Sequence, residues 1–229
     1  MSNDNTSHAN SAKNNILQRL ALAGLDANDV AAVKGKGSVD SLTLLVDEPA
    51  VELRQSFVDK MQASHAEVIA CVKTDLQKTI NDLLVRKQFK QLLISERVGW
   101  VKDMDIGDTQ CLYFADNIES FKQQLFTDID AAITTSHGSI ADTGSIILRP
   151  DSVEPRSMSL VPPVHIVIVE EQSMHPNFAQ VMKQEQWQTC MPTNMILVSG
   201  PSKTADIQQT LAYGAHGPRE LIVILVAAV

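Results

Sequence analysis

The first half of the chain alternates between two hydrophobic patterns. Leu53, Phe57 and Met61 recur at every fourth position, which predicts a helix with one apolar face. Residues 74–88 have a similar spacing and predict a second helix. Short continuous apolar runs separate these segments and are typical of buried strands. The expected strands are residues 66–72, 91–95 and 110–115, and a third helix is expected at residues 117–126.

The second half is richer in apolar runs. We expect strands at residues 128–136, 144–150, 164–169, 194–200 and 220–229, and helices at residues 177–186 and 205–213. A turn at residues 142–144 predicts an antiparallel excursion. Helices that alternate with continuous apolar strands are typical of a parallel sheet covered on both faces. The pattern therefore predicts an α/β domain with a mostly parallel sheet.

The N-terminal part has a different pattern. Residues 1–12 are polar and rich in Asn and Ser, which is typical of a disordered tail. Residues 12–25 predict a short helix, and a polar, glycine-bearing linker follows. We therefore expect a flexible N-terminal tail with a short helix and linker over residues 1–44, and one α/β domain over residues 45–229.

Composition narrows the class of protein. The formal net charge of −8 argues against a general nucleic-acid binder. The three cysteines, Cys71, Cys111 and Cys190, include no CxxC pair, which fits a reducing compartment and offers no local ligand cluster for iron–sulfur or zinc. Residues 1–15 lack the pattern of a secretory signal, and the apolar run 221–229 is too short to span a bilayer. We expect a cytoplasmic protein without a membrane span.

The turn Asp142-Thr143-Gly144 has the letters of an aspartic protease loop. Such proteases need two carboxylates that share a proton, and this chain has one copy of the motif within an α/β pattern. A tight turn explains it better, with Asp142 bonded to nearby backbone and Gly144 supplying a permissive φ.

Residues 154–169 place two polar side chains beside prolines. Arg156 follows Pro155 and precedes Ser159, and an arginine on a rigid loop can hold a carboxylate or phosphate bidentately. The same residues are equally consistent with a surface arginine that binds no ligand. His165 opens an apolar strand, where it is either a hydrogen-bonded structural histidine or a catalytic one.

A third polar segment follows the strand expected at residues 194–200. It consists of Ser199, Gly200, Pro201, Ser202, Lys203 and Thr204. With the helix expected at residues 205–213, the arrangement predicts an anion-binding turn at a helix N-terminus. Ser202 or Thr204 alone can instead be an N-cap. The segment is not a P-loop, because no glycine directly precedes Lys203.

His216 lies between glycines in the last turn before the C-terminal strand. A histidine in such a turn is often close to a ligand, although a plain connecting loop has the same composition. It joins the candidate site residues.

Four segments in this order resemble the LUD domain family, of the lactate utilization protein C type. They are residues 140–148 (IADTGSIIL), 155–169 (PRSMSLVPPVHIVIV), 199–207 (SGPSKTADI) and 216–221 (HGPREL). The resemblance covers roughly residues 45–229. It implies a fold similar to the NagB/RpiA/CoA-transferase-like superfamily, a Rossmann-like three-layer α/β/α sandwich. Relatives usually carry Glu-Thr-Gly in the first segment, and here Asp142 replaces the glutamate.

The resemblance also implies a role in oxidising L-lactate to pyruvate within a three-protein system whose other members carry Fe–S clusters. This sequence has no dinucleotide fingerprint, cysteine cluster or redox cysteine pair to hold the two electrons. We therefore expect no cofactor on this chain and Fe–S clusters on its partners.

The candidate site follows from these segments. The anion-binding residues would be Thr143, Gly144, Arg156, Ser159, Ser199, Gly200, Ser202, Lys203 and Thr204, and the catalytic candidates are His165, His216 and Asp142. The ligand would be a small carboxylate or another anion, with a histidine as the proton acceptor. Two other interpretations stay open: an independent enzyme of the superfamily acting on a sugar phosphate, CoA ester or folate, and a non-catalytic assembly factor.

Overall fold

The structure is a computed structural model that describes residues 50–114, 118–187, 189–205, 211–214 and 216–227. The expected N-terminal tail, short helix and linker lie outside these residues.

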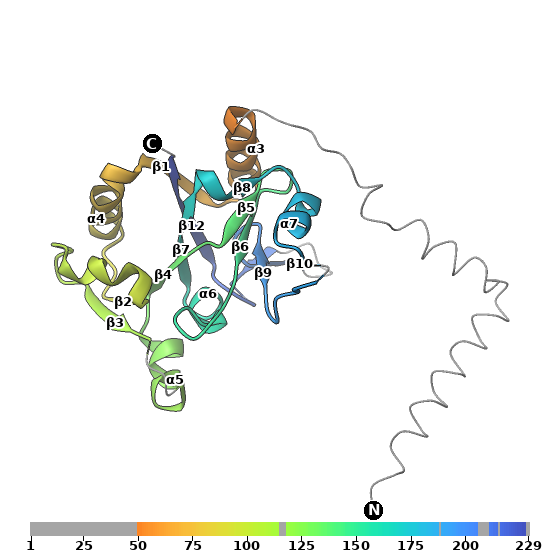
Figure 1. The fold of residues 1–229 in the computed structure, drawn as a ribbon. Coiled ribbons are helices and arrows are strands. Elements are labelled where there is room, and N and C mark those ends of the chain that lie inside the picture. The colour runs from red at the N-terminus through yellow and green to blue at the C-terminus, as the bar shows by residue number, and fades with distance from the viewer. Residues whose placement is uncertain (1–49, 115–117, 188, 206–210, 215, 228–229) are drawn as a thin grey trace, which may run out of the picture. The chain divides into compact units, whose positions relative to one another are not determined.

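A six-stranded sheet forms the centre of the fold (Figure 1). Its order is β1-β12-β7-β4-β2-β3, and every neighbouring pair is parallel. The strands are β1 (Glu67–Val72), β2 (Gln91–Ile94), β3 (Gln110–Tyr113), β4 (Ala131–Thr135), β7 (Val164–Glu170) and β12 (Glu220–Ala227). Continuous apolar runs form these strands because both faces are covered. The predicted α/β fold with a parallel sheet is confirmed.

One face of the sheet packs on α4 (Leu76–Lys87) and the 3₁₀ segment η3 (Glu96–Asp103). A short 3₁₀ turn, η2 (Lys73–Asp75), leads into α4. The predicted apolar stripe of α4 is buried at Ile80, Leu83 and Leu84. These side chains contact the alternate strand positions that include Ile166 and Ile224.

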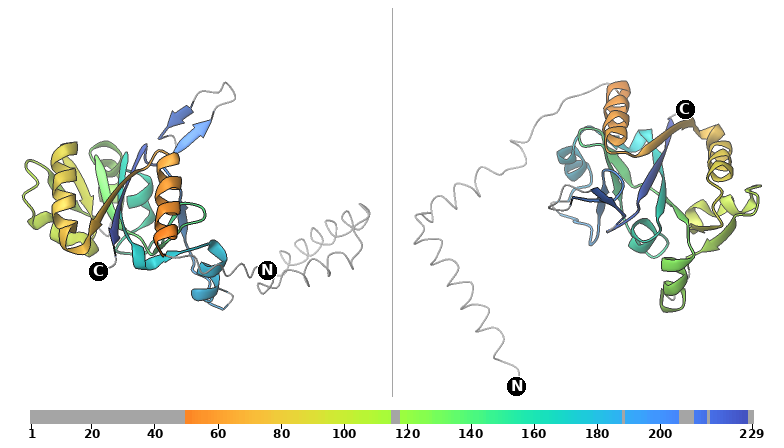
Figure 2. Two further views of the ribbon diagram at one scale, coloured as in Figure 1. Left: turned by 90° about the horizontal axis from the view of Figure 1, so that it is seen from above. Right: turned by 180° about the vertical axis from the view of Figure 1, so that it is seen from behind.

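The opposite face packs on three helices and part of a second sheet. The apolar stripe of α3 (Ala50–Ala63) is buried there at Leu53, Phe57 and Met61, as the every-fourth spacing predicted. Helix α6 (Arg156–Leu160) contributes Met158 to a further cluster, which also contains Leu125 of α5 (Ile118–Thr127). Figure 2 shows α3 and α4 on opposite sides of the sheet.

The antiparallel excursion is a sheet in its own right, with strand order β8-β5-β6-β9. Its strands are β5 (Gly138–Ile140), β6 (Ser145–Leu148), β8 (Met174–His175) and β9 (Ile196–Val198). Strands β5 and β6 flank the Asp142–Gly144 turn and pair antiparallel, as the sequence predicted. The 3₁₀ turn η4 (Glu171–Ser173) precedes β8, and α7 (Phe178–Gln184) follows it.

The prediction of a helix at residues 205–213 is wrong. Residues Lys203–Ala205 form β10, Leu211–Tyr213 form β11, and the two pair antiparallel. Both strands are anchored to the loop region before β12: Ser202 N donates to Pro218 O at 2.7 Å, and Gly214 N donates to Ser202 O at 2.9 Å. These non-local bonds override a helical spacing that rested on only two apolar residues. Figure 2 shows this hairpin projecting from the body of the fold.

Candidate functional site

A cavity of about 260 Å³ lies at the amino ends of β7 and β12. We call it the amino-edge cavity. Its lining residues come from α6, β9, the starts of β7, β10 and β12, and the two loops that join the β10–β11 hairpin to β9 and β12. They are Ser159, Leu160, His165, Ile196, Leu197, Val198, Ser199, Gly200, Pro201, Ser202, Lys203, His216, Gly217, Pro218 and Leu221. The fold thus brings together seven predicted site residues that come from three separate segments of the sequence.

His165 is the most deeply buried polar residue of the cavity wall, with 1% of its surface exposed. Its Nε2 lies 2.7 Å from Thr134 Oγ1 on the neighbouring strand β4. Its Nδ1 is buried and has no hydrogen-bond partner among the described residues. Burial lowers the pKa of His165 to about 4 because the charged imidazolium loses its hydration. The ring is therefore neutral near pH 7 and is a weak base.

Ser199, Lys203 and His216 are the exposed polar residues of the wall. The His216 backbone N–H donates to Ser202 Oγ at 3.3 Å, so the hydroxyl connects the two loops. Because the strand β10 follows Ser202, the predicted helix N-terminus is absent at this part of the wall. An anion in this cavity would be held by a lysine, hydroxyl groups and imidazole.

A chain of hydroxyl groups links the Asp142–Gly144 turn to the cavity wall. Thr143 Oγ1 lies 2.7 Å from Ser145 Oγ, which lies 2.7 Å from Ser199 Oγ. Ser145 is 3% exposed, and Ser199 lines the cavity. The turn therefore supports the Ser199 segment from behind and does not form a wall of the cavity.

Two glycines of the predicted anion site are needed for packing. Gly144 has φ +56°, and a Cβ added there would lie 2.5 Å from Lys60 Cβ. Gly200 has φ +147°, and its Cβ would lie 2.9 Å from Ser64 Cβ. Both glycines thus let the backbone approach the C-terminal part of α3 in a conformation that other residues avoid.

Two further predicted residues, Asp142 and Arg156, do not line the amino-edge cavity. Asp142 is exposed, and its backbone N–H donates to Pro176 O at 2.9 Å. Arg156 is the exposed first residue of α6, and its backbone oxygen accepts a hydrogen bond from Ser159 Oγ at 3.1 Å. Thr204 lies within β10. The structure therefore separates the Arg156 guanidinium from the residues it was expected to assist.

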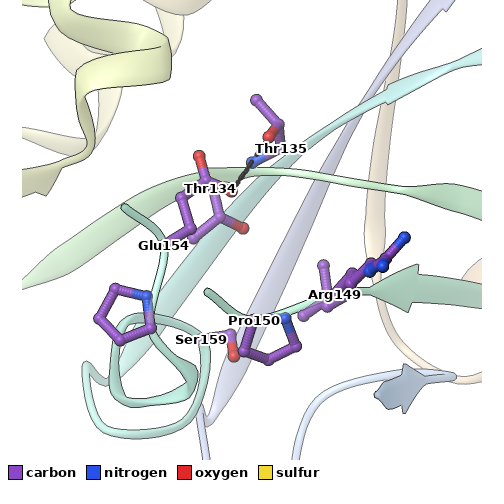
Figure 3. Close-up of a pocket in the computed structure, with 8 residues that line it drawn as sticks. Thr134, Thr135, Arg149, Pro150, Glu154 and Ser159 are labelled. Carbon is purple, nitrogen blue, oxygen red and sulfur yellow. Dashed lines mark hydrogen bonds between the residues drawn. The ribbon is translucent and has the colours of Figure 1, made fainter. Parts of the chain in front are cut away.

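Sequence analysis missed a polar cluster at the opposite, carboxyl edge of the sheet. Glu154 is 6% exposed and accepts hydrogen bonds from Ser95 Oγ at 2.7 Å, Thr135 N at 3.1 Å and Thr135 Oγ1 at 3.0 Å. We call these residues, with Arg97 and Asp151, the carboxyl-edge cluster. Figure 3 shows Glu154 reaching Thr135. The space beside them measures about 10 Å³, close to the volume that holds one water molecule.

Arg97 completes this cluster at the surface. Its NH1 lies 3.3 Å from Glu154 Oε2, and its NH2 pairs with Asp151. Asp151 Oδ1 also accepts hydrogen bonds from Glu154 N and Val153 N, each at 2.9 Å. The bond from Glu154 N, the largest cause, and the Arg97 contacts hold the pKa of Asp151 below its ordinary value. Every oxygen of Glu154 therefore already has a protein partner.

A cavity of about 380 Å³ lies next to this cluster at the carboxyl ends of β2 and β3. It is lined by Ser95, Glu96, Tyr113, Phe114, Ser152 and Val153. The Ser95 hydroxyl is already bonded to Glu154, and the Tyr113 hydroxyl donates to Gly99 O at 3.3 Å. These residues have no periodic spacing along the chain, and local sequence patterns therefore did not indicate this cavity.

Neither a metal centre nor a membrane helix appears in the described part of the chain. No three His, Cys, Asp or Glu side chains lie close enough together there to ligate a metal ion. Among the described helices, none combines the length and apolar character that crossing a membrane requires.

Residues 54–226 match the LUD domain family. An uncharacterized protein of Neisseria meningitidis is 35% identical over 181 residues, which cover 77% of this chain and 78% of that protein. Lactate utilization protein C 1 of Bacillus mycoides is 28% identical over 192 residues, which cover 76% of this chain and 79% of the relative.

The crystal structure of a DUF162 family protein from Deinococcus radiodurans has a similar fold. The TM-score is 0.59 at 20% sequence identity, and the alignment covers 78% of this chain and 99% of the other. At this identity the likeness extends to the fold alone.

Proposed function

Because the chain belongs to the LUD domain family, we propose that it serves L-lactate oxidation to pyruvate as a subunit without Fe–S clusters, binding the small carboxylate in its amino-edge cavity. Relatives named lactate utilization protein C make it a lactate-utilization-related LUD protein. What we propose beyond this is the reaction, the Fe–S partners and the binding of the carboxylate in the cavity.

The lining of the amino-edge cavity carries the proposal. Lys203 supplies a positive charge, Ser199 and Ser202 supply hydroxyl groups, and the described lining residues include no Asp or Glu. A carboxylate is stabilised by such donors without a nearby repelling charge. At about 260 Å³ the cavity is smaller than the roughly 300–1,000 Å³ pockets of drug-sized ligands. The size favours lactate over a CoA ester or folate.

The proposed reaction removes two electrons and two protons from L-lactate, one proton from the hydroxyl group and one from Cα. The partner proteins take up the electrons and the Cα proton. The electrons pass to Fe–S clusters on partner proteins, which are the oxidant. This chain binds and orients the carboxylate through Lys203 and the hydroxyl groups. His216, the exposed histidine of the wall, accepts the hydroxyl proton, since the low pKa of His165 makes that ring a weak base.

Calorimetry with L-lactate tests the binding step. We expect Lys203→Gln to weaken lactate binding about tenfold, the value of a charge-assisted hydrogen bond. Arg156→Gln is the matched control, because it removes one cation of the same chain outside the cavity, and its affinity should stay within twofold. Equal loss in both variants, or no lactate binding by the wild type, would contradict the proposal. Heat from a sugar phosphate alone would favour the independent enzyme.

Reconstitution tests the role in the pathway. Lactate-dependent dye reduction by the purified Fe–S partners should require this chain and should fall with Lys203→Gln. An equal rate without the chain would remove it from catalysis and leave the assembly role.

A further inference from the structure

His165, a wall residue of the amino-edge cavity, contacts Thr134, which lies behind it on β4 and does not line that cavity. Thr134 is 3% exposed and His165 is 1% exposed, so bulk water does not compete with the contact between their side chains. Thr134 Oγ1 and His165 Nε2 are 2.7 Å apart. His165 Nδ1 is buried without a partner among the described residues, and the imidazole lines the cavity.

Two proton arrangements fit this contact. If the Thr134 hydroxyl donates to Nε2, the hydroxyl proton and Nε2 are both satisfied, and the ring proton lies on Nδ1. If Nε2 donates to Thr134 instead, the buried hydroxyl proton needs another acceptor, and none is found among the described residues. The first arrangement leaves one buried group unpaired, the Nδ1–H, whereas the second leaves two, the hydroxyl proton and the Nδ1 lone pair. Unpaired buried polar groups are costly, so the first arrangement is favoured.

We propose that Thr134 is a positioning residue that fixes the tautomer of His165, so that the neutral imidazole donates a hydrogen bond from Nδ1 to a ligand oxygen in the amino-edge cavity. This inference rests on the proposed function only in taking that cavity as the ligand site. It assigns Thr134 a role that its sequence context did not indicate.

The electrostatics of the wall agree with this assignment. Burial keeps His165 neutral near pH 7, so the ring carries one proton and can be either a donor or an acceptor at Nδ1. A neutral donor stabilises a carboxylate or carbonyl oxygen without giving it a proton. His165 thereby selects ligands with an acceptor oxygen, and proton removal is left to another group of the wall.

Nitrogen-15 NMR of the wild-type chain tests the tautomer directly. Protonated and unprotonated ring nitrogens have widely separated chemical shifts, so the spectrum reports which nitrogen of His165 carries the proton. We expect a protonated Nδ1, and we expect its resonance to shift when L-lactate, pyruvate or inorganic phosphate is added. An unprotonated Nδ1, or a protonated Nδ1 that none of these probes shifts, would overturn the inference. A response to phosphate without one to lactate or pyruvate would support it and contradict the proposed function.

Paired substitutions test the positioning role. Thr134→Val removes the hydroxyl at nearly constant volume and should mix the two tautomers, while Thr134→Ser should restore the wild-type spectrum. His165→Asn keeps an amide donor near the place of Nδ1, and His165→Gln keeps one near Nε2 instead. For the probe that binds the wild type, we expect affinity to fall about tenfold with Gln and less than threefold with Asn. The reverse order would contradict donation from Nδ1.

Discussion

The two edges of the central sheet use polar residues in different ways. In the carboxyl-edge cluster, Glu154 accepts hydrogen bonds from Ser95 and Thr135 and lies beside Arg97. At the amino edge, His165 Nδ1 has no partner among the described residues, and its ring lines a cavity of about 260 Å³. The paired polar groups of the carboxyl edge join segments of the fold, whereas the unpaired imidazole of the amino edge is the group that we propose binds a ligand.

This difference reverses the usual expectation for α/β sheets. Ligands commonly bind at the carboxyl edge where successive connections leave in opposite directions. Here β2 leads to β3 on one side and β4 leads to β7 on the other, so that point lies between β2 and β4. Glu154 bridges these strand ends through Ser95 and Thr135. A protein side chain thus occupies the place where a ligand is expected.

The largest expected effect is the loss of the carboxyl-edge cluster. Glu154→Ala leaves Ser95, Thr135 and Arg97 without their shared acceptor and should lower the free energy of unfolding by about 3 kcal/mol. Urea denaturation measures the change. The folded variant should bind lactate as the wild type does. Weakened binding at unchanged stability would show that Glu154 belongs to a ligand site.

Gly144→Ala separates packing from binding in the turn behind the cavity. We expect a loss of about 2.5 kcal/mol, from a left-handed backbone and the contact with Lys60. Gly107→Ala is the matched control, because Gly107 has φ +64° with nothing within 4 Å of an added Cβ. It should lose only about 1 kcal/mol. Equal losses measured by denaturation would mean that the approach to α3 is unimportant.

Acid should weaken the fold through His165. Its pKa of about 4 in the folded chain lies below the ordinary 6.5, so the unfolded chain binds the proton more readily. The stability is present above pH 6.5 and is lost as the pH falls from there toward 4. Between pH 7 and pH 5 this residue should account for about 2 kcal/mol. Unfolding of His165→Asn should show a correspondingly smaller pH dependence; an unchanged dependence would place the acid sensitivity elsewhere.

The smallest effect should come from Asp142→Glu. The side chain is exposed on the turn and does not line the amino-edge cavity, so stability should change by less than about 0.5 kcal/mol. Lactate affinity should also stay unchanged. A clear gain in reconstituted activity would show that this carboxylate contacts a partner or substrate.

The strands and most helices were predictable because burial leaves a local pattern. The apolar stripe of Leu53, Phe57 and Met61 identified α3, and the continuous apolar run that ends before residue 170 identified β7. The hairpin β10–β11 was not predictable, since its bonds join Ser202 to Pro218 and Gly214. The spacing of two apolar residues along the chain contains no information about such long-range hydrogen bonds.

The candidate site likewise contains residues that the sequence predicted and residues that it did not. His165, Lys203 and His216 were proposed from local context, and the fold brings them to one cavity. Glu154 was overlooked because its partner Ser95 is 59 residues away in sequence, and Thr134 because its contact with His165 spans 31. Arg156 looked suitable as an anion ligand in a proline-rich segment, but its place at the start of α6 leaves it exposed.

The bonds that anchor the hairpin have a consequence for insertion and design. The backbone of Ser202 forms hydrogen bonds with Pro218 and Gly214. These bonds hold the cavity wall together at the base of the hairpin. Loop length adds little entropic cost once the base of a loop is fixed. Beyond Lys203, which lines the cavity, the hairpin can therefore be shortened, lengthened or replaced by a tag during evolution or engineering, while the wall keeps its shape.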